Sequence, residues 1–398
     1  SWEEFSDLGV KADIKKFEIK GEQAGDLQLN GTADYTRNSA GLDINLNLEK
    51  VDLGSILADL NYSSEITSKF DIQAQIPLQG NLLQSLTADI DATISPSSIF
   101  GINLTDGAVD VSYENQILDI KSLELNADKN KLIASGKSPE KLVADFNYEI
   151  EVENLSFISG ISPDLALSGN LKASGDITGN LQNPTITIDG EILNFSMDES
   201  YTAKSINIDG SGTVNTKDPN LKAKIDIDTL TINKKEIREI SLDLSSEGAA
   251  INADLNIIED DQFQYEMIAK LLDLSTAQKD IEISQLKLQL EDTILDNRDN
   301  ILLTLASSGF VLQNFNLYHN DSSALANANI SGSKIDGNVK ISNLSLDDIT
   351  KALEFQTPLQ GTINANVDIE GTKQKPGINA SIQTQDLQYN DFKNDNIL

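Results

Sequence analysis

The feature that most constrains this chain is an alternation of polar and apolar residues with a period of two. Leu42, Ile44 and Leu46 are separated by single polar residues, and the same pattern recurs at residues 221–227 and 363–369. Successive side chains of a strand point to opposite faces, so each segment places aliphatic side chains on one face only. A sheet that is apolar on one face is typically antiparallel. Helical periodicity is nearly absent, and the sequence therefore predicts an all-β fold.

Part of this pattern is written twice along the chain. Residues 165–188 and 357–380 share their glycine and proline positions at an offset of 192 residues, at the pairs Gly169 and Gly361, Gly179 and Gly371, and Pro184 and Pro376. Such repetition is typical of stacked, quasi-one-dimensional architectures. We predict one continuous repeating β-groove segment over residues 1–398, with repeat starts near residues 50, 154 and 343. Residues 247–275 leave room for a further copy, in which 267–272 fits a strand or a helix equally.

Two kinds of signal punctuate the predicted strands. Short helical interruptions are expected at residues 53–60 and 346–353, where leucine and isoleucine follow a helical spacing. Asx-Gly pairs predict tight hairpin turns, at Asn30-Gly31, Asp106-Gly107, Asp189-Gly190, Asp209-Gly210 and Asp336-Gly337. Together they predict on the order of 25–30 strands in a long, curled antiparallel sheet.

Composition excludes several classes of partner. The chain has 30 Lys plus Arg against 63 Asp plus Glu, a net charge of −33, so nucleic-acid phosphates would be repelled. It contains no cysteine and no apolar run near the 18–20 residues that span a bilayer. The chain begins at Ser1 rather than at a methionine. We expect an internal segment of a larger protein whose membrane anchor lies elsewhere.

Catalytic chemistry has little support in the sequence. His319 is the only histidine, which leaves no partner for a histidine-based metal site. The pairs Asp89 and Asp91, and Asp226 and Asp228, have the spacing of a wet strand face and lack the loop of a calcium site. We predict no enzymatic activity, no catalytic residue, no metal and no cofactor.

A sheet that is apolar on one face must have that face covered. Three arrangements do this: packing against a second sheet, winding into a closed solenoid, or curling into a trough that holds an apolar ligand. The chain has only 12 Phe, 8 Tyr and 1 Trp, so aliphatic side chains would leave a narrow slot suited to hydrocarbon chains. The residues predicted to line this groove are Leu42, Ile44, Leu46, Ile186, Ile188, Ile192, Leu221, Ala223, Ile225, Ile227, Leu286, Leu288, Leu290, Ile363, Ala365, Val367 and Ile369.

Several phrases of the sequence carry a family resemblance. The run of alternating Leu, Gly, Ala and Ile at 167–184, its echo at 359–376, the segment 51–57 and the strand-then-glycine phrases at 25–31 and 130–136 resemble the TamB and AsmA-like proteins. The resemblance implies a repeating β-groove with an aliphatic lumen. It also implies a location in the periplasm of a diderm bacterium, with a tether to the inner membrane, and phospholipid transport between the inner and outer membranes.

The partners implied by this resemblance are a phospholipid or another acyl-chain lipid, both membranes through parts outside this segment, and an outer-membrane barrel protein. No nucleic acid is expected. Two alternatives to a lipid conduit remain open. One is a structural or adhesive extracellular β-solenoid, which would have shorter, stricter repeats. The other is a polysaccharide-active enzyme, which would need an aromatic-lined cleft.

Overall fold

The computed structural model describes the chain in two compact units, Ser1–Val214 and Asn215–Leu398. The described residues are 10–21, 25–35, 39–52, 64–79, 85–99, 102–156, 166–198, 200–213, 215, 217–272, 274, 276–291, 293–347, 350, 359–389 and 392–397. Within these ranges no helix has the length and apolar character needed to cross a membrane.

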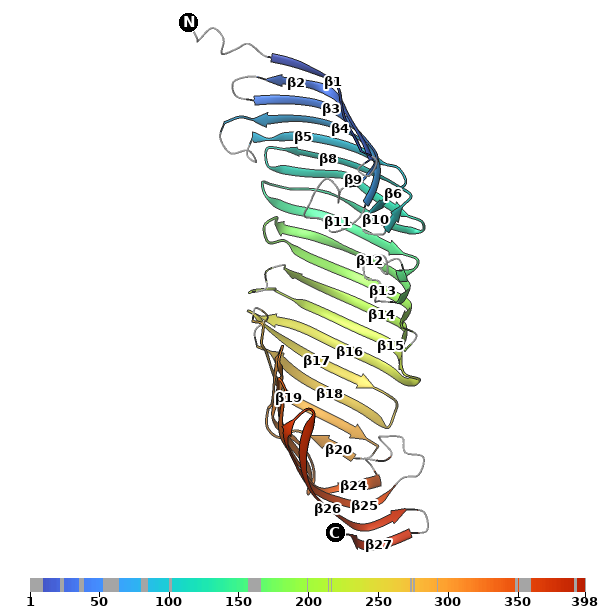
Figure 1. Cartoon of the computed structure of the whole chain (residues 1–398), viewed down its shortest axis with the longest axis vertical. Coiled ribbons are helices and arrows are strands. Elements are labelled where there is room, and N and C mark those ends of the chain that lie inside the picture. Colours follow the sequence, from blue (N-terminus) through green and yellow to red (C-terminus); the bar gives the residue numbers. More distant parts are fainter. Residues whose placement is uncertain are drawn as a thin grey trace. The chain divides into compact units, whose positions relative to one another are not determined.

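The described part of the first unit contains, in chain order (Figure 1), the strands β1 (Val10–Gly21), β2 (Gly25–Tyr35), β3 (Ser39–Val51), β4 (Ser64–Pro77), β5 (Thr87–Ile94), β6 (Ser97–Ile99), β7 (Ile102–Leu104), β8 (Asp106–Glu114), β9 (Ile117–Ala127), β10 (Asn130–Lys137), β11 (Val143–Val152), β12 (Leu167–Asn180), β13 (Thr185–Met197) and β14 (Tyr201–Thr213). The second unit contains β15 (Lys222–Ile232), β16 (Lys235–Glu247), β17 (Ala250–Ile258), β18 (Phe263–Leu271), β19 (Lys279–Leu290), β20 (Thr293–Asp296), β21 (Ile301–Ala306), β22 (Gly309–His319), β23 (Ser322–Ser331), β24 (Lys334–Ser345), β25 (Gln360–Thr372), β26 (Lys375–Tyr389) and β27 (Phe392–Ile397).

Within each unit the strands pair one after another, and every pairing between described strands is antiparallel. The short hairpin β6–β7 pairs with the start of β4, while β5 pairs directly with β8. β20 and β21 both pair with β19 and act as one strand interrupted at residues 297–300. The predicted all-β, antiparallel architecture is confirmed.

The predicted positions of the hairpin turns are wrong. Asn30-Gly31 lies inside β2, Asp189-Gly190 inside β13 and Asp209-Gly210 inside β14, while Asp106-Gly107 opens β8 and Asp336-Gly337 lies within β24. The reason is close backbone approach. A Cβ added at Gly31 would lie 2.2 Å from the carbonyl oxygen of Asp43 on β3, so glycine is required there in an extended strand. Real turns use pairs such as Asn115-Gln116 and Asn233-Lys234, whose φ angles are all positive.

Bulges interrupt the pairing of alternate strands. They lie on β1, β3, β9 and β13 in the first unit and on β19, β22, β24 and β26 in the second. Lys50, Asn194, Asn343 and Asp386 have positive φ angles and lie at the bulges near the ends of β3, β13, β24 and β26. Alternate strands of an antiparallel sheet run the same way, so within each unit these ends share one edge. A bulge bends its strand and increases twist, and these bulges therefore curve that edge.

The 192-residue offset has a counterpart in the backbone. Gly169 and Gly361 both have positive φ angles, of 129° and 112°. A Cβ at Gly169 would lie 3.0 Å from Leu193 O, and one at Gly361 would lie 2.5 Å from Gln385 O. Each glycine therefore faces the bulge on the following strand, and the bulge residues Asn194 and Asp386 share the same offset. The division into repeats starting near 50, 154 and 343, within one continuous groove, stays a prediction.

The helical interruptions have mixed outcomes. The first, at residues 53–60, lies outside the described residues. The second is helical at Leu346, Asp347 and Thr350, and the Thr350 hydroxyl donates a hydrogen bond of 2.7 Å to Leu346 O. Residues 267–271, which the sequence left open between strand and helix, belong to β18.

Candidate functional site

The candidate site is the apolar face of the sheet in each unit. Directly paired residues share a face, and in the first unit one row runs from Ile44 through Ile72 and Ile90 to Val111. In the second unit a row runs from Ile225 through Leu242, Leu255 and Met267 to Leu286. We call this face the trough face and the opposite one the polar face.

All of the predicted groove residues lie on the trough face of their own unit. The residues from the first unit lie on β3 and β13, and those from the second lie on β15, β19 and β25 or, for Leu221, next to β15. All are half-buried except Ala365, which is 9% exposed. A role in lining a lipid groove stays a prediction for all of them.

Many aliphatic side chains of the trough face are partly exposed in the described part of each unit. The close contacts between described strands join neighbours in the pairing order or the short β6–β7 hairpin. Many of the buried apolar residues are alanines, such as Ala92, Ala144, Ala173, Ala203 and Ala269, which larger neighbours on the same face can cover. In a packed sandwich the interdigitated aliphatic side chains would themselves be buried. The predicted groove residues, apart from Ala365, therefore remain partly accessible to solvent in the described part of each unit.

One stretch of the second unit is more enclosed. Leu295 and Ile301, which face Leu288 and Ile283 on β19, are 6% and 1% exposed. The interruption between β20 and β21 is held nearby by Asn316, whose side-chain oxygen accepts hydrogen bonds from the backbone N–H groups of residues 298 and 299. The predicted groove is consequently not uniform along the chain.

The polar face carries carboxylates in direct opposition. Asp71, Asp91 and Asp110 face one another across β4, β5 and β8. Lys121 Nζ lies 2.8 Å from Asp110 Oδ1, and this hydrogen bond, with the charges of the neighbouring aspartates, raises the pKa of Lys121. Exposed ion pairs of this kind contribute little to stability. Like charges directly opposite one another repel, so this row of carboxylates indicates a face that water solvates rather than a binding site.

An aromatic side chain lies across the floor of the trough in the first unit. Tyr148 on β11 faces Gly175 on β12, and its hydroxyl donates a hydrogen bond of 2.7 Å to the carbonyl oxygen of Thr187 on β13. Partial burial raises the pKa of Tyr148. The missing side chain of Gly175 makes this crossing possible, because a Cβ there would lie 2.9 Å from the Tyr148 hydroxyl. The Tyr148 hydroxyl is thus satisfied by a backbone carbonyl, and the floor of the trough stays apolar.

A second trough-face tyrosine is tied at the edge of the sheet. Tyr265 on β18 faces Ile257 and Leu288, and its hydroxyl donates to Glu259 Oε2 at 3.1 Å. Burial, followed by the negative charge of Glu259, raises the pKa of Tyr265 to about 12. Both effects disfavour the phenolate.

This shift gives a measurable pH dependence. An unfolded tyrosine titrates near 10, so the unfolded chain loses this proton first and stability falls between about pH 10 and pH 12. In an ultraviolet difference titration, Tyr265→Phe should remove a phenolate signal that appears near pH 12. Glu259→Gln should shift the midpoint of that signal to a lower pH, because Tyr265 stays buried while the negative charge of Glu259 is lost. If the phenolate signal that Tyr265→Phe removes has its midpoint near pH 10, the environment described for Tyr265 is contradicted.

The remaining candidate groups have structural partners. His319 Nδ1 lies 2.8 Å from Ile294 O, and its Nε2 lies 2.9 Å from Asn320 Nδ2. The hydrogen bond from Lys224, followed by one from Ser241, lowers the pKa of Asp226. Across the described ranges, His, Asp and Glu residues form no group of three that could hold a metal ion.

Sequence reasoning missed two features of the trough. The Tyr148–Gly175 crossing needs the register between β11 and β12, which the strand pattern alone does not reveal. A polar pocket beside the β9–β10 hairpin joins Ile102 to Glu153, which are far apart in the chain. No local motif marked either one.

Comparison with known proteins gives one match. A family model described as the N-terminal domain of TamB matches residues 10–267, which is more than half of the 398 residues. No curated protein matches the chain, and no solved structure does.

Proposed function

The chain belongs to the TamB family, and from this membership and the partly exposed apolar trough face we propose that it is a non-enzymatic lipid conduit. The trough face would shield the acyl chains of a phospholipid that moves between the inner and outer membranes. The observation that carries the proposal is that aliphatic residues such as Ile44, Ile186 and Ile225 line one face of the sheet and remain partly exposed to solvent. A closed structural solenoid, the alternative, would bury them.

The energetics of such a surface suit a sliding ligand. Burial of a methylene group gains about 0.8 kcal/mol, so a sixteen-carbon chain gains roughly 10–13 kcal/mol when it is shielded from water. This gain needs no specific polar partner. Because the aliphatic rows continue from strand to strand, the gain is similar at successive positions, and a lipid meets no deep trap along the described rows.

The family belongs to the bacterial cell envelope, and we place the conduit in the periplasm. A tether to the inner membrane, contact with both membranes and an outer-membrane barrel partner would come from other parts of a longer protein. The acidic polar face fits the role of a solvated exterior.

Native mass spectrometry of the detergent-free protein tests the proposal. After incubation with phospholipid vesicles and removal of the vesicles, we expect adducts with the masses of intact phospholipids. Lipid extraction from the same sample should return the same species. A protein that stays free of lipid in both measurements would overturn the conduit.

A further inference from the structure

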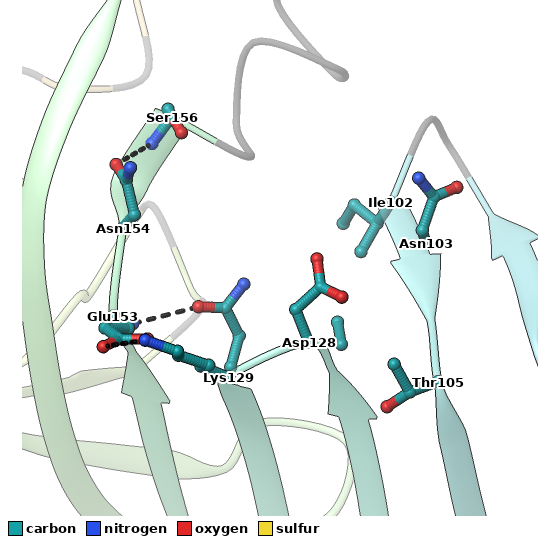
Figure 2. Close-up of a pocket in the computed structure, with 10 residues that line it drawn as sticks. Ile102, Asn103, Thr105, Asp128, Lys129, Glu153, Asn154 and Ser156 are labelled. Atoms are coloured by element: carbon teal, nitrogen blue, oxygen red, sulfur yellow. Dashed lines mark hydrogen bonds and ion pairs between the residues drawn. The ribbon is translucent and has the colours of Figure 1, made fainter.

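A polar pocket lies at one edge of the trough in the first unit. Its volume is about 820 Å³, within the range of pockets that hold small molecules. The walls come from β7, from the hairpin that joins β9 to β10, and from the segment that follows β11 (Figure 2). Leu155, 4% exposed, lies in that last segment.

The pocket adjoins the trough face directly. Ala127 and Asn130, which line it, face each other across the hairpin. Each lies two residues from a member of the Leu125–Leu132 pair, so they belong to the same face as these leucines. A ligand whose polar end occupies the pocket can therefore lay an apolar chain on Leu125, Leu132 and the neighbouring Ile150.

The polar groups of the pocket are partly committed to one another. Lys129 Nζ lies 2.7 Å from Glu153 Oε1, and the Asn130 side-chain oxygen accepts from Glu153 N at 2.9 Å. The Asn154 side-chain oxygen accepts from Ser156 N, which leaves its NH₂ group available. Lys129 uses one of three donors on Glu153 and keeps two.

Two other side chains have no partner among the described residues. They are the carboxylate of Asp128 and the amide of Asn103. In Figure 2 the Asp128 carboxylate points into the space between the hairpin and β7. With respect to the described residues, the pocket thus offers one carboxylate without an ion-pair partner, beside spare N–H donors of Lys129, Asn103 and Asn154.

We infer that this pocket binds the zwitterionic headgroup of an amine-bearing phospholipid whose acyl chains lie on the trough face. The ammonium would pair with Asp128, and the phosphate would accept from Lys129 and from the free amides. This inference rests on the proposed function and adds a headgroup preference to it. In this inference the edge of the trough recognises the polar headgroup, which the aliphatic floor does not contact.

The test compares two lipids that differ in headgroup alone. The protein is incubated with vesicles that contain equal amounts of phosphatidylethanolamine and phosphatidylglycerol with identical acyl chains, and the bound lipids are counted by native mass spectrometry. The overall negative charge also repels phosphatidylglycerol, so the variant comparison decides. Asp128→Asn removes the charge and suits the backbone, because residue 128 has a φ of 52° and asparagine tolerates this region. Asp145→Asn is the matched control, an exposed aspartate on the polar face of β11.

We expect the ratio of bound phosphatidylethanolamine to bound phosphatidylglycerol to be about threefold higher for the wild type and for Asp145→Asn than for Asp128→Asn. A factor of this size corresponds to the loss of one partly exposed ion pair. Equal ratios in all three proteins, with lipid bound, would overturn the headgroup inference and leave the conduit intact. Absence of any bound lipid would overturn both. Soluble phosphoethanolamine serves as a further arm. If soluble phosphoethanolamine saturates the pocket at the same concentration as the lipid, the pocket binds a free small molecule, and the inference of a lipid headgroup site is contradicted.

Discussion

Ile227→Asp is expected to reduce phospholipid transfer between vesicles about tenfold while the protein keeps its fold. Ile227 lies on the trough face of β15, opposite Ile240, and is half-buried. Because Ile227 is partly exposed, a carboxylate at this position can reach water in the empty protein, and we expect the fold to be retained. The carboxylate must lose that water when an acyl chain passes, and desolvation of an unpaired charge is costly. The measurement is the transfer rate of a fluorescent phospholipid from donor to acceptor vesicles.

The matched control places the same charge on the other face. Val311 on β22 lies on the polar face between Thr304 and Asn329, which are both neutral. Val311→Asp should transfer lipid at the wild-type rate. The total lipid bound by Ile227→Asp should fall only modestly, because the rest of the trough face is unchanged. Equal transfer rates for the two variants would show that lipid does not travel along this face.

The strands themselves were predictable from the sequence. A period of two over many residues depends only on the geometry of an extended chain, and the structure places Leu42, Ile44 and Leu46 on one face as expected. The set of predicted groove residues followed from the same rule, because every second residue of a strand shares its face. The family resemblance, too, was carried by this alternation and its glycines.

Turn positions were not predictable in the same way. An Asx-Gly pair can form a tight turn, but a glycine is equally required where a neighbouring backbone comes too close for a Cβ. Gly31 is such a case, and only the pairing partner, Asp43 on β3, reveals it. The bulges share this property, because Asn194 looks like an ordinary strand residue until Gly169 is placed opposite it. Register between strands is long-range information, and local patterns do not contain it.

The same limit explains why the edge pocket was missed. Asp128 and Lys129 belong to a hairpin, and Glu153 lies at the end of a different strand. The sequence phrase at 130–136 carried a family resemblance without indicating that its first residue, Asn130, lines a pocket. Recognition groups at the edge of a sheet come together through pairing of several strands.

Gly175→Val is expected to disrupt the centre of the first unit, with a loss of about 2–3 kcal/mol in local stability. A Cβ at this position would lie 2.0 Å from the carbonyl oxygen of Thr187 and 2.9 Å from the Tyr148 hydroxyl. Either β12 and β13 move apart or the tyrosine leaves the floor, and both break the 2.7 Å hydrogen bond to Thr187. Tyr148→Phe should cost about 1 kcal/mol, because it removes that hydrogen bond and keeps the ring.

Hydrogen exchange is the appropriate measurement, since long arrays of strands lose stability locally rather than as one unit. Amide protection in β11, β12 and β13 should fall for Gly175→Val and stay unchanged in β3 and β4. Gly179→Asn is the control on the same strand: it has a φ of 85° and nothing within 4 Å of an added Cβ. Asparagine tolerates that backbone, so protection should be nearly that of the wild type. If Gly175→Val were as well protected as this control, the close crossing of Tyr148 over Gly175 would not be a fixed part of the trough floor.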